Sequence, residues 1–343
     1  EDGYITPWVS VNVVSQVVAD WTGVPVSNVS TDEAVALLTL EETLKKRVVG
    51  QDAGLTAIAK SLRISRAGLT DTRKPIGVFM MCGPSGTGKT ETALAIADQV
   101  FGGEDAVITI NMTEFKELHK TSMLLGAAAG YVGYGQGGVL TEAVKRRPYS
   151  VVLLDEMEKA HPEVQDIFYQ IFDKGFISDS EGTKVDFRNT IIIMTSNAAE
   201  NEIREIVSSA EEGLPSAETI EARIKPVLLQ HFKPAFLGRT KVIPYFPLDD
   251  EASTLISRIH LDRIGKRLLS QYGATFDYSD TFLKHIVDSN NDPLSGGRAL
   301  ERIINGDLLP QLANLCIEQV VQGYSIEKVS VDAIDNRITI ELE

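Results

Sequence analysis

The sequence predicts an α/β fold with a parallel sheet flanked by helices, followed by a smaller, mainly helical α+β C-terminal domain. Short apolar runs alternate with helical periodicity up to about residue 245, which is typical of strands buried between two layers of helices. The runs are 76–81, 107–110, 151–154, 191–195 and 242–244. A helical block then extends from residue 247 to about residue 322. Two short alternating runs near residues 328 and 337 predict a final pair of strands.

The order of these elements divides the chain into three parts. Residues 1–40 are mixed in character and are expected to form a lead-in linker. Residues 41–246 are expected to form the large domain, which begins with helical spacing that is interrupted at 48–51. Within it, residues 208–219 contain charged residues, Gly and Pro, which predicts an exposed loop. Residues 247–343 are expected to form the small C-terminal domain.

Composition argues against several classes of protein. The 343 residues include 43% hydrophobic side chains, which is enough apolar surface for two globular domains. The net charge of −15 disfavours non-specific attraction to nucleic acid or to an anionic membrane. No apolar run approaches the roughly 18 residues of a membrane span. We therefore expect no nucleic-acid partner and no membrane span.

The cysteines and the first residues bear on location. Cys82 and Cys316 lie far apart and have no metal-ligand spacing, so we expect two reduced thiols, as in the cytosol. The acidic start lacks the basic region of a signal peptide. A cytoplasmic location is the expectation. The chain does not begin with Met, and we expect it to be a part of a longer protein.

A phosphate-binding loop is predicted directly after the first apolar run. Its residues are Gly83, Pro84, Ser85, Gly86, Thr87, Gly88, Lys89 and Thr90. Backbone N–H groups of such a loop surround a triphosphate, and the helix that follows directs its positive end at the anion. We expect Lys89 to reach the β- and γ-phosphates of ATP and Thr90 to hold Mg²⁺ through its hydroxyl. The alternative is a Gly-rich turn.

Two carboxylates follow the apolar run at 151–154. Asp155 and Glu156 stand where a parallel strand delivers side chains to the carboxyl edge of a sheet. Asp155 is expected to bind Mg²⁺, usually through water, and Glu156 to polarise the attacking water. The alternative is a strand that ends in two solvated acids. The phosphate loop earlier in the chain favours the catalytic interpretation.

Three further residues are candidates for the reaction. Asn197 follows the run at 191–195 and is a candidate for orienting water beside the γ-phosphate, although an Asn after a strand is more often a turn former. Arg239 and Arg298 stand where loops should end. A guanidinium stabilises the charge that phosphoryl transfer spreads over the γ-phosphate. For either arginine alone, a surface salt bridge is the alternative.

Residues 130–138 contain five glycines and two tyrosines. A flexible loop that carries an exposed aromatic side chain can grip extended polypeptide without reading its sequence. The alternative is a Gly-rich turn whose tyrosines pack in the core. The segment alone does not decide between the two.

Taken together, these residues resemble an AAA+ ATPase of the Clp/Hsp100 class, and specifically the second ATPase ring of its double-ring members. The resemblance covers nearly the whole chain. It implies a P-loop AAA+ sheet, a small C-terminal domain of the Clp D2-small type, ATP and Mg²⁺ as cofactors, and a homo-hexamer that threads polypeptide through a central pore. It also implies residue roles: 21–26, Val48 and Val49 near the adenine, Tyr131 and Val132 in the pore loop, Arg239 as an arginine finger acting on the next subunit, and Arg298 as the second sensor.

Two segments favour one branch of this class. Residues 168–175 and 234–239 resemble the ClpV family of type VI secretion, whereas the ClpB disaggregase family usually has other residues there. This implies subunits of the contracted secretion sheath as the substrate, with a ClpB-type disaggregase module as the alternative. No Ile-Gly-Phe or Ile-Gly-Leu tripeptide occurs between Asn197 and Arg239, where members that dock on the ClpP peptidase carry one. We therefore expect no ClpP-type peptidase partner.

The sequence thus predicts an enzyme that couples ATP hydrolysis to protein remodelling. Two other classes stay open. One is a nucleotide-gated binding or scaffold protein, which the intact pair of Asp155 and Glu156 argues against. The other is a DNA-directed AAA+ loader or helicase, which the acidic balance and the aromatic Gly-rich loop oppose.

Overall fold

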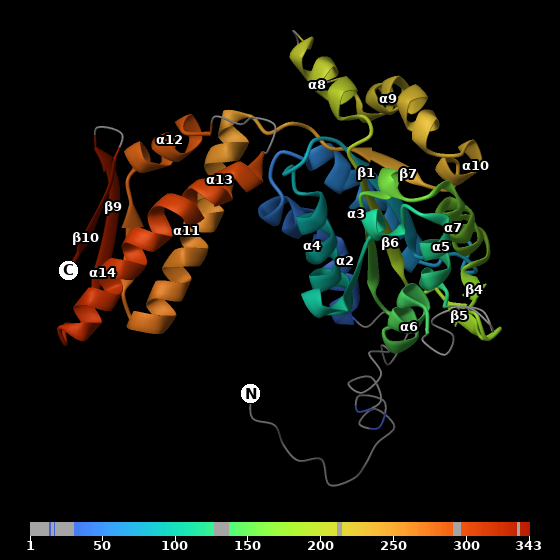
Figure 1. Cartoon of the computed structure of the whole chain (residues 1–343), viewed down its shortest axis with the longest axis horizontal. Coiled ribbons are helices and arrows are strands. Elements are labelled where there is room, and N and C mark those ends of the chain that lie inside the picture. The colour runs from blue at the N-terminus through green and yellow to red at the C-terminus, as the bar shows by residue number, and fades with distance from the viewer. Residues whose placement is uncertain are drawn as a thin grey trace.

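The computed structural model describes residues 31–126, 137–210, 215–290, 296–334 and 337–343, together with Val14 and Val17. The described residues form two lobes, a large α/β lobe and a small lobe, joined by the segment that follows strand β7 (Figure 1). Cys82 and Cys316 are buried and unpaired.

The large lobe is built on a parallel five-stranded sheet with the order β2-β3-β6-β1-β7. Its strands in chain order are β1 (Gly77–Cys82), β2 (Val107–Asn111), β3 (Val151–Asp155), β6 (Ile191–Ser196) and β7 (Lys241–Pro244). Each predicted apolar run falls within or beside one of these strands. Strand β6 is buried along its whole length, as expected for a strand covered on both faces. The predicted parallel sheet is confirmed.

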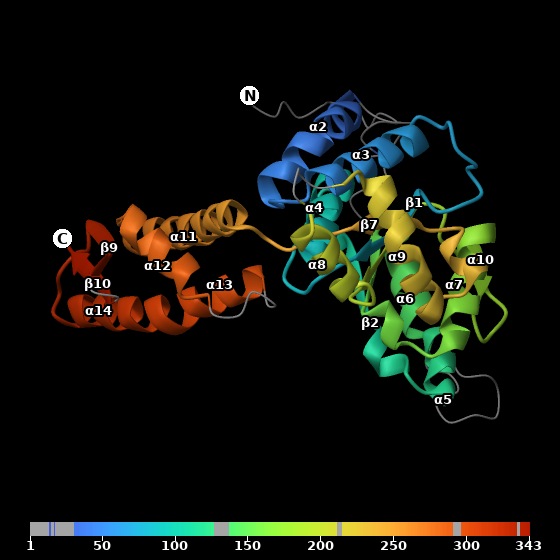
Figure 2. The ribbon, with the colours of Figure 1, turned by 90° about the horizontal axis from the view of Figure 1, so that it is seen from above.

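Two layers of helices cover the sheet. Side chains of β1 alternate between the layers, because Phe79 and Met81 belong to one buried cluster and Met80 and Cys82 to the other. The first layer consists of α2 (Thr31–Arg47), α3 (Asp52–Arg66) and α4 (Lys89–Phe101). The other helices of this lobe are α5 (Leu118–Thr121), α6 (Val139–Arg146), α7 (Pro162–Lys174), α8 (Glu200–Ser208), α9 (Ala217–His231) and α10 (Pro234–Leu237). Figure 2 shows α2 and α3 on one side of the large lobe and α7 and α10 on the other.

Short elements complete the large lobe. The interruption expected at 48–51 separates α2 from α3. An antiparallel hairpin of β4 (Phe176–Ser178) and β5 (Lys184–Asp186) follows α7. Single helical turns lie at η1 (Glu104–Ala106), η2 (Met112–Phe115), η3 (Ser122–Leu124) and η4 (Met157–Lys159). The hairpin was not predicted, because its three-residue strands are too short to show a period.

The small lobe is mainly helical, as predicted. Its elements are α11 (Asp250–Tyr272), β8 (Thr275–Tyr278), α12 (Asp280–Asp288), α13 (Gly297–Ile303), the π-helical turn η5 (Ile304–Leu308), α14 (Leu309–Val321), β9 (Lys328–Ile334) and β10 (Arg337–Leu342). Strands β9 and β10 are antiparallel and correspond to the predicted strand pair. Strand β8 adds a parallel partner to β9 inside the block that was expected to be helical. Phe276 of β8 packs against the buried cluster of this lobe, which explains why an isolated four-residue segment is extended there.

Candidate nucleotide-binding site

A cavity of about 410 Å³ lies between the two lobes. The large lobe contributes the end of α2, the loop after β1, the start of α4 and the carboxyl ends of β3 and β6. The small lobe contributes α11 and α13. The lining residues are Arg47, Val48, Val49, Ser85, Gly86, Thr87, Gly88, Lys89, Thr90, Glu91, Asp155, Glu156, Thr195, Asn197, Ile256, Ile259, His260, Arg263, Gly297, Arg298 and Glu301.

The loop after β1 turns sharply into α4. Gly83 has a φ of +152°, and a Cβ there would lie 2.2 Å from the carbonyl oxygen of Tyr245, so a side chain does not fit. Gly88 caps α4 in the left-handed conformation, with a φ of 95°. Residues Lys89 to Glu91 at the start of α4 line the cavity. The free backbone N–H groups of this helix end therefore lie beside the cavity, which is an arrangement that favours an anion.

Lys89 is held at the floor of the cavity with only 8% of its surface exposed. Its Nζ donates to the carbonyl oxygens of Gly83 and Pro84, each at 2.7 Å, and to Oδ1 of Asn197 at 3.0 Å. Burial lowers the pKa of Lys89 to about 8, because a desolvated ammonium is less stable than a hydrated one. A polyphosphate in the cavity would favour the charged form.

The carboxyl ends of β3 and β6 are joined by a hydroxyl. Thr195 is 3% exposed, and its Oγ1 donates to Oδ1 of Asp155 at 2.6 Å. The same oxygen accepts from the backbone N–H of Glu156 at 3.0 Å. Glu156 has φ 57° and ψ 51°, and it is the only non-glycine residue in the described ranges with a positive φ. Thr195 therefore fixes both carboxylate residues at the end of the strand, one of them in a strained conformation.

Asn197 connects this edge to the phosphate loop. Its side-chain oxygen accepts from Lys89, and its backbone N–H donates to Oε1 of Glu158 at 3.3 Å. Because β1, β3 and β6 are neighbours in the parallel sheet, their carboxyl ends bring Lys89, Asp155 and Asn197 to one place.

The small lobe contacts the phosphate loop directly. The backbone N–H of Gly297 donates to the carbonyl oxygen of Gly86 at 2.9 Å. Nη1 of Arg298 donates to Oγ of Ser85 at 3.1 Å. Gly296 has a φ of +51°, and a Cβ there would lie 2.9 Å from the carbonyl oxygen of Gly86. The start of α13 thus approaches the loop more closely than a side chain at Gly296 would allow.

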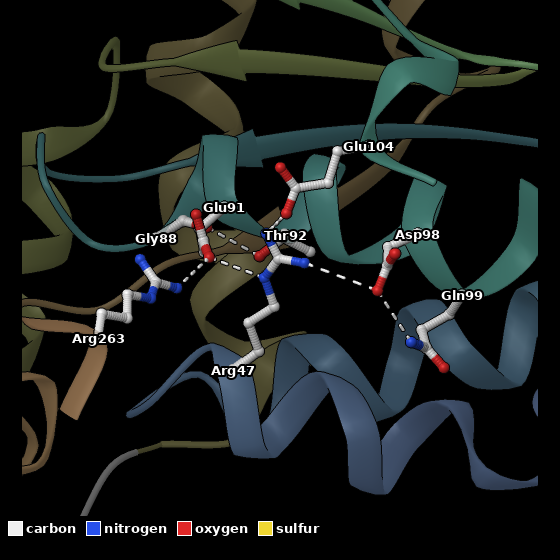
Figure 3. A network of polar contacts seen from close by, with 8 residues as sticks. All are labelled: Arg47, Gly88, Glu91, Thr92, Asp98, Gln99, Glu104 and Arg263. Atoms are coloured by element: carbon white, nitrogen blue, oxygen red, sulfur yellow. Dashed lines mark hydrogen bonds and ion pairs between the residues drawn. The ribbon is translucent and has the colours of Figure 1, made fainter. Parts of the chain in front are cut away.

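A network of charges joins the lobes beside the cavity (Figure 3). Nε of Arg47 donates to Oε1 of Glu91 at 2.7 Å, and Arg263 of α11 donates to the same oxygen at 3.1 Å. Arg47 also contacts Glu104 and lies 3.9 Å from Asp98. Burial opposes ionisation of Glu91, but the two arginines outweigh it, and the pKa of Glu91 lies below its usual value. Glu91 therefore links α2, α4 and α11.

One face of α11 lines the cavity. Its residues Ile256, Ile259, His260 and Arg263 have the spacing i, i+3, i+4, i+7 of a single helix face. Burial lowers the pKa of His260, which favours the neutral imidazole.

Most of the predicted site residues line this cavity. They are Val48, Val49, Ser85, Gly86, Thr87, Gly88, Lys89, Thr90, Asp155, Glu156, Asn197 and Arg298. Gly83 and Pro84 do not line it, but their carbonyl oxygens accept hydrogen bonds from Lys89. Tyr131 and Val132 lie outside the described residues, as do residues 21–26.

Arg239 is not among the lining residues. It follows α10, and its Nε donates to Oδ1 of Asp173 on α7 at 3.0 Å. Both helices lie on the side of the large lobe that faces away from the small lobe and the cavity (Figures 1 and 2).

Sequence reasoning missed the residues whose role depends on packing between distant segments. They are Arg47, Glu91, Thr195, His260, Arg263 and Glu301. The position of Glu91 directly after Thr90 and the polar residues on an otherwise apolar face of α11 were the available signals.

Thr90 and Asp155 are suited to Mg²⁺ by their chemistry. Hydroxyl and carboxylate oxygens are the ligands that this ion prefers, usually together with phosphate oxygens and water. Within the described ranges, no cluster of three or more His, Cys, Asp or Glu side chains is arranged to hold a metal by itself. No described helix has the length and apolar character needed to cross a membrane.

Comparisons with known proteins identify relatives of both lobes. Residues 74–243 match the family model for an AAA domain of the Cdc48 subfamily, and residues 248–331 match the model for the C-terminal D2-small domain of ClpB. The chain is 47% identical over 337 residues to the AAA+ ATPase ClpV1 of Pseudomonas aeruginosa, covering 98% of the chain and 37% of that protein. It is 45% identical over 334 residues to the chaperone protein ClpB of Yersinia enterocolitica, covering 97% of the chain and 37% of that protein.

A third relative is the ClpB chaperone of Meiothermus ruber, which is 43% identical over 306 residues, or 89% of the chain and 35% of that protein. The chain therefore spans little more than a third of the length of these relatives.

Proposed function

The chain belongs to the Clp/Hsp100 family of AAA+ ATPases, and from this premise we propose that it is the second ATPase module of a hexameric motor that remodels proteins. Family membership makes it an ATPase. We further propose its assembly, its substrate and the roles of its individual residues. We also propose that the chain divides into a lead-in linker at 1–40, a large domain at 41–246 and a small domain at 247–343.

The observation that carries the proposal is that polar side chains from both lobes come together around one cavity. Lys89 would bind the β- and γ-phosphates of ATP, with Val48 and Val49 beside the adenine. Glu156 and Asn197 would position the attacking water, and Arg298 would sense the nucleotide from the small lobe. The hydroxyl of Thr90 and the carboxylate of Asp155 would hold Mg²⁺, which neutralises charge on the β- and γ-phosphates when bound.

The position of Arg239 supports a role in a neighbouring subunit. A guanidinium on the side of the lobe opposite its own cavity cannot reach its own nucleotide, whereas it can reach one bound by the next subunit in a ring. We propose that Arg239 completes that neighbour's site by stabilising the charge of the transition state.

The action on polypeptide rests on the sequence. Tyr131 and Val132 would line a central pore and pull extended polypeptide through it as ATP is hydrolysed. We propose a cytoplasmic motor whose substrate is the contracted sheath of type VI secretion, because the segments at 168–175 and 234–239 resemble the ClpV family. No ClpP-type peptidase is expected as a partner.

A ClpB-type disaggregase module is the second candidate, because the identity to a ClpB chaperone is nearly as high, at 45% against 47%. Contracted sheaths and heat-aggregated protein, offered separately to the full-length protein, distinguish the two. Disassembly of sheaths with no recovery of aggregated protein supports the first candidate, and the reverse result supports the second.

The catalytic assignment is tested with Glu156→Gln. This variant should bind ATP with the affinity of the parent chain and release no phosphate, because the amide cannot polarise water as a carboxylate does. Undiminished turnover would remove Glu156 from its proposed role. Stimulation by unfolded polypeptide but not by single-stranded DNA separates a protein motor from a DNA-directed one.

The assembly is tested by measuring specific ATPase activity against protein concentration for the parent chain and for Arg239→Ala. Activity that rises with concentration and collapses in the variant supports a site completed between subunits. Low activity that is independent of concentration in both proteins would contradict a ring formed by this module alone.

A further inference from the structure

The guanidinium of Arg239 is fixed by three groups. Its Nε donates to Oδ1 of Asp173 at 3.0 Å, and its Nη1 donates to the carbonyl oxygen of Ala235 at 3.3 Å. Its Cζ lies 4.1 Å from the centroid of the Tyr169 ring. Two of the three guanidinium nitrogens are therefore hydrogen-bonded, and the group lies over an aromatic ring.

These contacts leave one end of the guanidinium available. Nη2 makes no hydrogen bond within the described ranges, and the Arg239 side chain is 31% exposed. A phosphate oxygen that approached this end would find donors whose direction is already set.

The partners of Arg239 are themselves held firmly. Tyr169 and Asp173 lie on α7, and between them Phe172 packs against Phe236 of α10, with ring centroids 5.3 Å apart. Gln165 of α7 donates to the carbonyl oxygen of His231 at 2.8 Å and accepts from the backbone N–H of Lys233 at 2.8 Å.

The chain before and through α10 is thus tied to α7 by a buried aromatic contact and two hydrogen bonds. The cradle of Tyr169 and Asp173 cannot shift relative to the backbone of Arg239 unless this packing is lost.

We propose that Tyr169 and Asp173 are positioning residues that orient the Arg239 guanidinium toward the nucleotide of the neighbouring subunit. The proposal rests on the function proposed above, in which Arg239 acts on that nucleotide. An exposed Arg–Asp pair contributes little to stability. A long arginine side chain that is already ordered, however, avoids the loss of rotamer freedom that would otherwise accompany contact with phosphate.

The experiment compares variants of the cradle in the full chain, at a protein concentration where specific activity has reached its plateau. Tyr169→Leu and Asp173→Asn should each lower kcat about two- to tenfold, the range expected for immobilising one flexible side chain. The KM for ATP should stay within about twofold, because Arg239 is proposed to stabilise the transition state at the neighbouring nucleotide and not the bound ATP. Tyr169→Phe keeps the ring face and should retain parental activity.

Matched controls come from the hairpin β4–β5. Asp186→Asn removes an acid that pairs with Arg188 and has nearly the same exposure as Asp173, 39% against 40%. Phe176→Leu removes a ring that lies beneath the Nζ of Lys184, at 3.7 Å from the ring centroid. Both controls should keep the parental kcat and KM.

A double-mutant cycle separates positioning from a structural role. In the Arg239→Ala background, Tyr169→Leu and Asp173→Asn should cause no further loss of activity, because their effect passes through the arginine. A further loss in that background, or unchanged kcat when Arg239 is present, would overturn the cradle while Arg239 keeps its proposed role. Unchanged activity of Arg239→Ala itself would overturn both the trans role of Arg239 and the cradle.

Discussion

Replacing Thr195 by Val tests whether one hydroxyl organises the catalytic edge of the sheet. The change removes the donor to Asp155 and the acceptor for the Glu156 N–H while retaining a β-branched side chain. A hydrogen bond to a charged group contributes about 1.5–3 kcal/mol, and a buried N–H without a partner costs about 1–3 kcal/mol. Because both acids line the cavity and water can replace part of this loss, we expect a destabilisation of about 2–3 kcal/mol.

The effect on turnover should exceed the effect on folding. The left-handed backbone of Glu156 is held by its hydrogen bond to Thr195, so its carboxylate should shift when the acceptor is lost. A displacement of about 1 Å at a reacting centre lowers rates about 100-fold, and we expect kcat to fall about 10- to 100-fold with ATP binding retained. Urea unfolding followed by circular dichroism and phosphate release at saturating ATP measure the two effects.

Thr190→Val is the matched control. Thr190 lies just before the same strand, is fully buried, and donates to the carbonyl oxygen of Phe187 at 2.8 Å, far from the carboxylates. This control should lose about 1 kcal/mol and keep its kcat. If Thr195→Val loses no more stability and no more activity than the control, the reasoning about the hydroxyl is wrong. Thr195→Ser, which retains the hydroxyl, should recover most of the turnover.

Three further predictions concern the cavity and the contact between the lobes. Because Lys89 has a pKa of about 8 and phosphate favours its charged form, ATP binding should take up a proton above pH 8, and the Kd for ATP should rise there by up to about tenfold per pH unit. Calorimetry in buffers of different ionisation enthalpy measures the proton uptake and the Kd. A Kd independent of pH between 8 and 9 would contradict the prediction. Arg263→Met should weaken ATP binding about two- to fivefold by removing an ion pair between the lobes, whereas Arg258→Met, which removes an ion pair inside the small lobe, should not. Gly296→Ala should lower kcat by pushing α13 away from the phosphate loop. Gly273→Ala is also at a positive φ but faces open space, so it should only destabilise the chain. Equal kcat values for these two variants would show that the close approach of α13 to the phosphate loop is irrelevant to turnover.

The fold was predictable from the sequence because the strands of the large sheet and the boundary between the first two helices are each indicated by a short stretch of neighbouring residues. Each buried strand shows as an apolar run, and the predicted helix interruption at 48–51 lies where α2 ends and α3 begins. The strand β8 was missed because a four-residue strand with alternating exposure resembles one turn of an amphipathic helix in sequence.

The candidate site was predictable only in part, for a related reason. Motif residues such as Lys89 and Asp155 are recognised in the sequence by their spacing and by the apolar run that precedes them. Arg47 and Arg263 do not, because a charged residue on a helix is normally solvated, and only the packing of two lobes brings both to Glu91. Thr195 is the last residue of the apolar run at 191–195, and nothing in the sequence indicates that its hydroxyl has two hydrogen-bond partners.

Helix α11 has a mechanical consequence. Its 23 residues make it roughly 34 Å long. The residues that line the cavity lie near its middle, from Ile256 to Arg263, and its last turn lies at the outer end of the small lobe. A tilt of about 5° about its first turn carries that last turn by about 3 Å. A shift about as long as one covalent bond beside the nucleotide is therefore amplified along the helix into a displacement of about 3 Å at Tyr272.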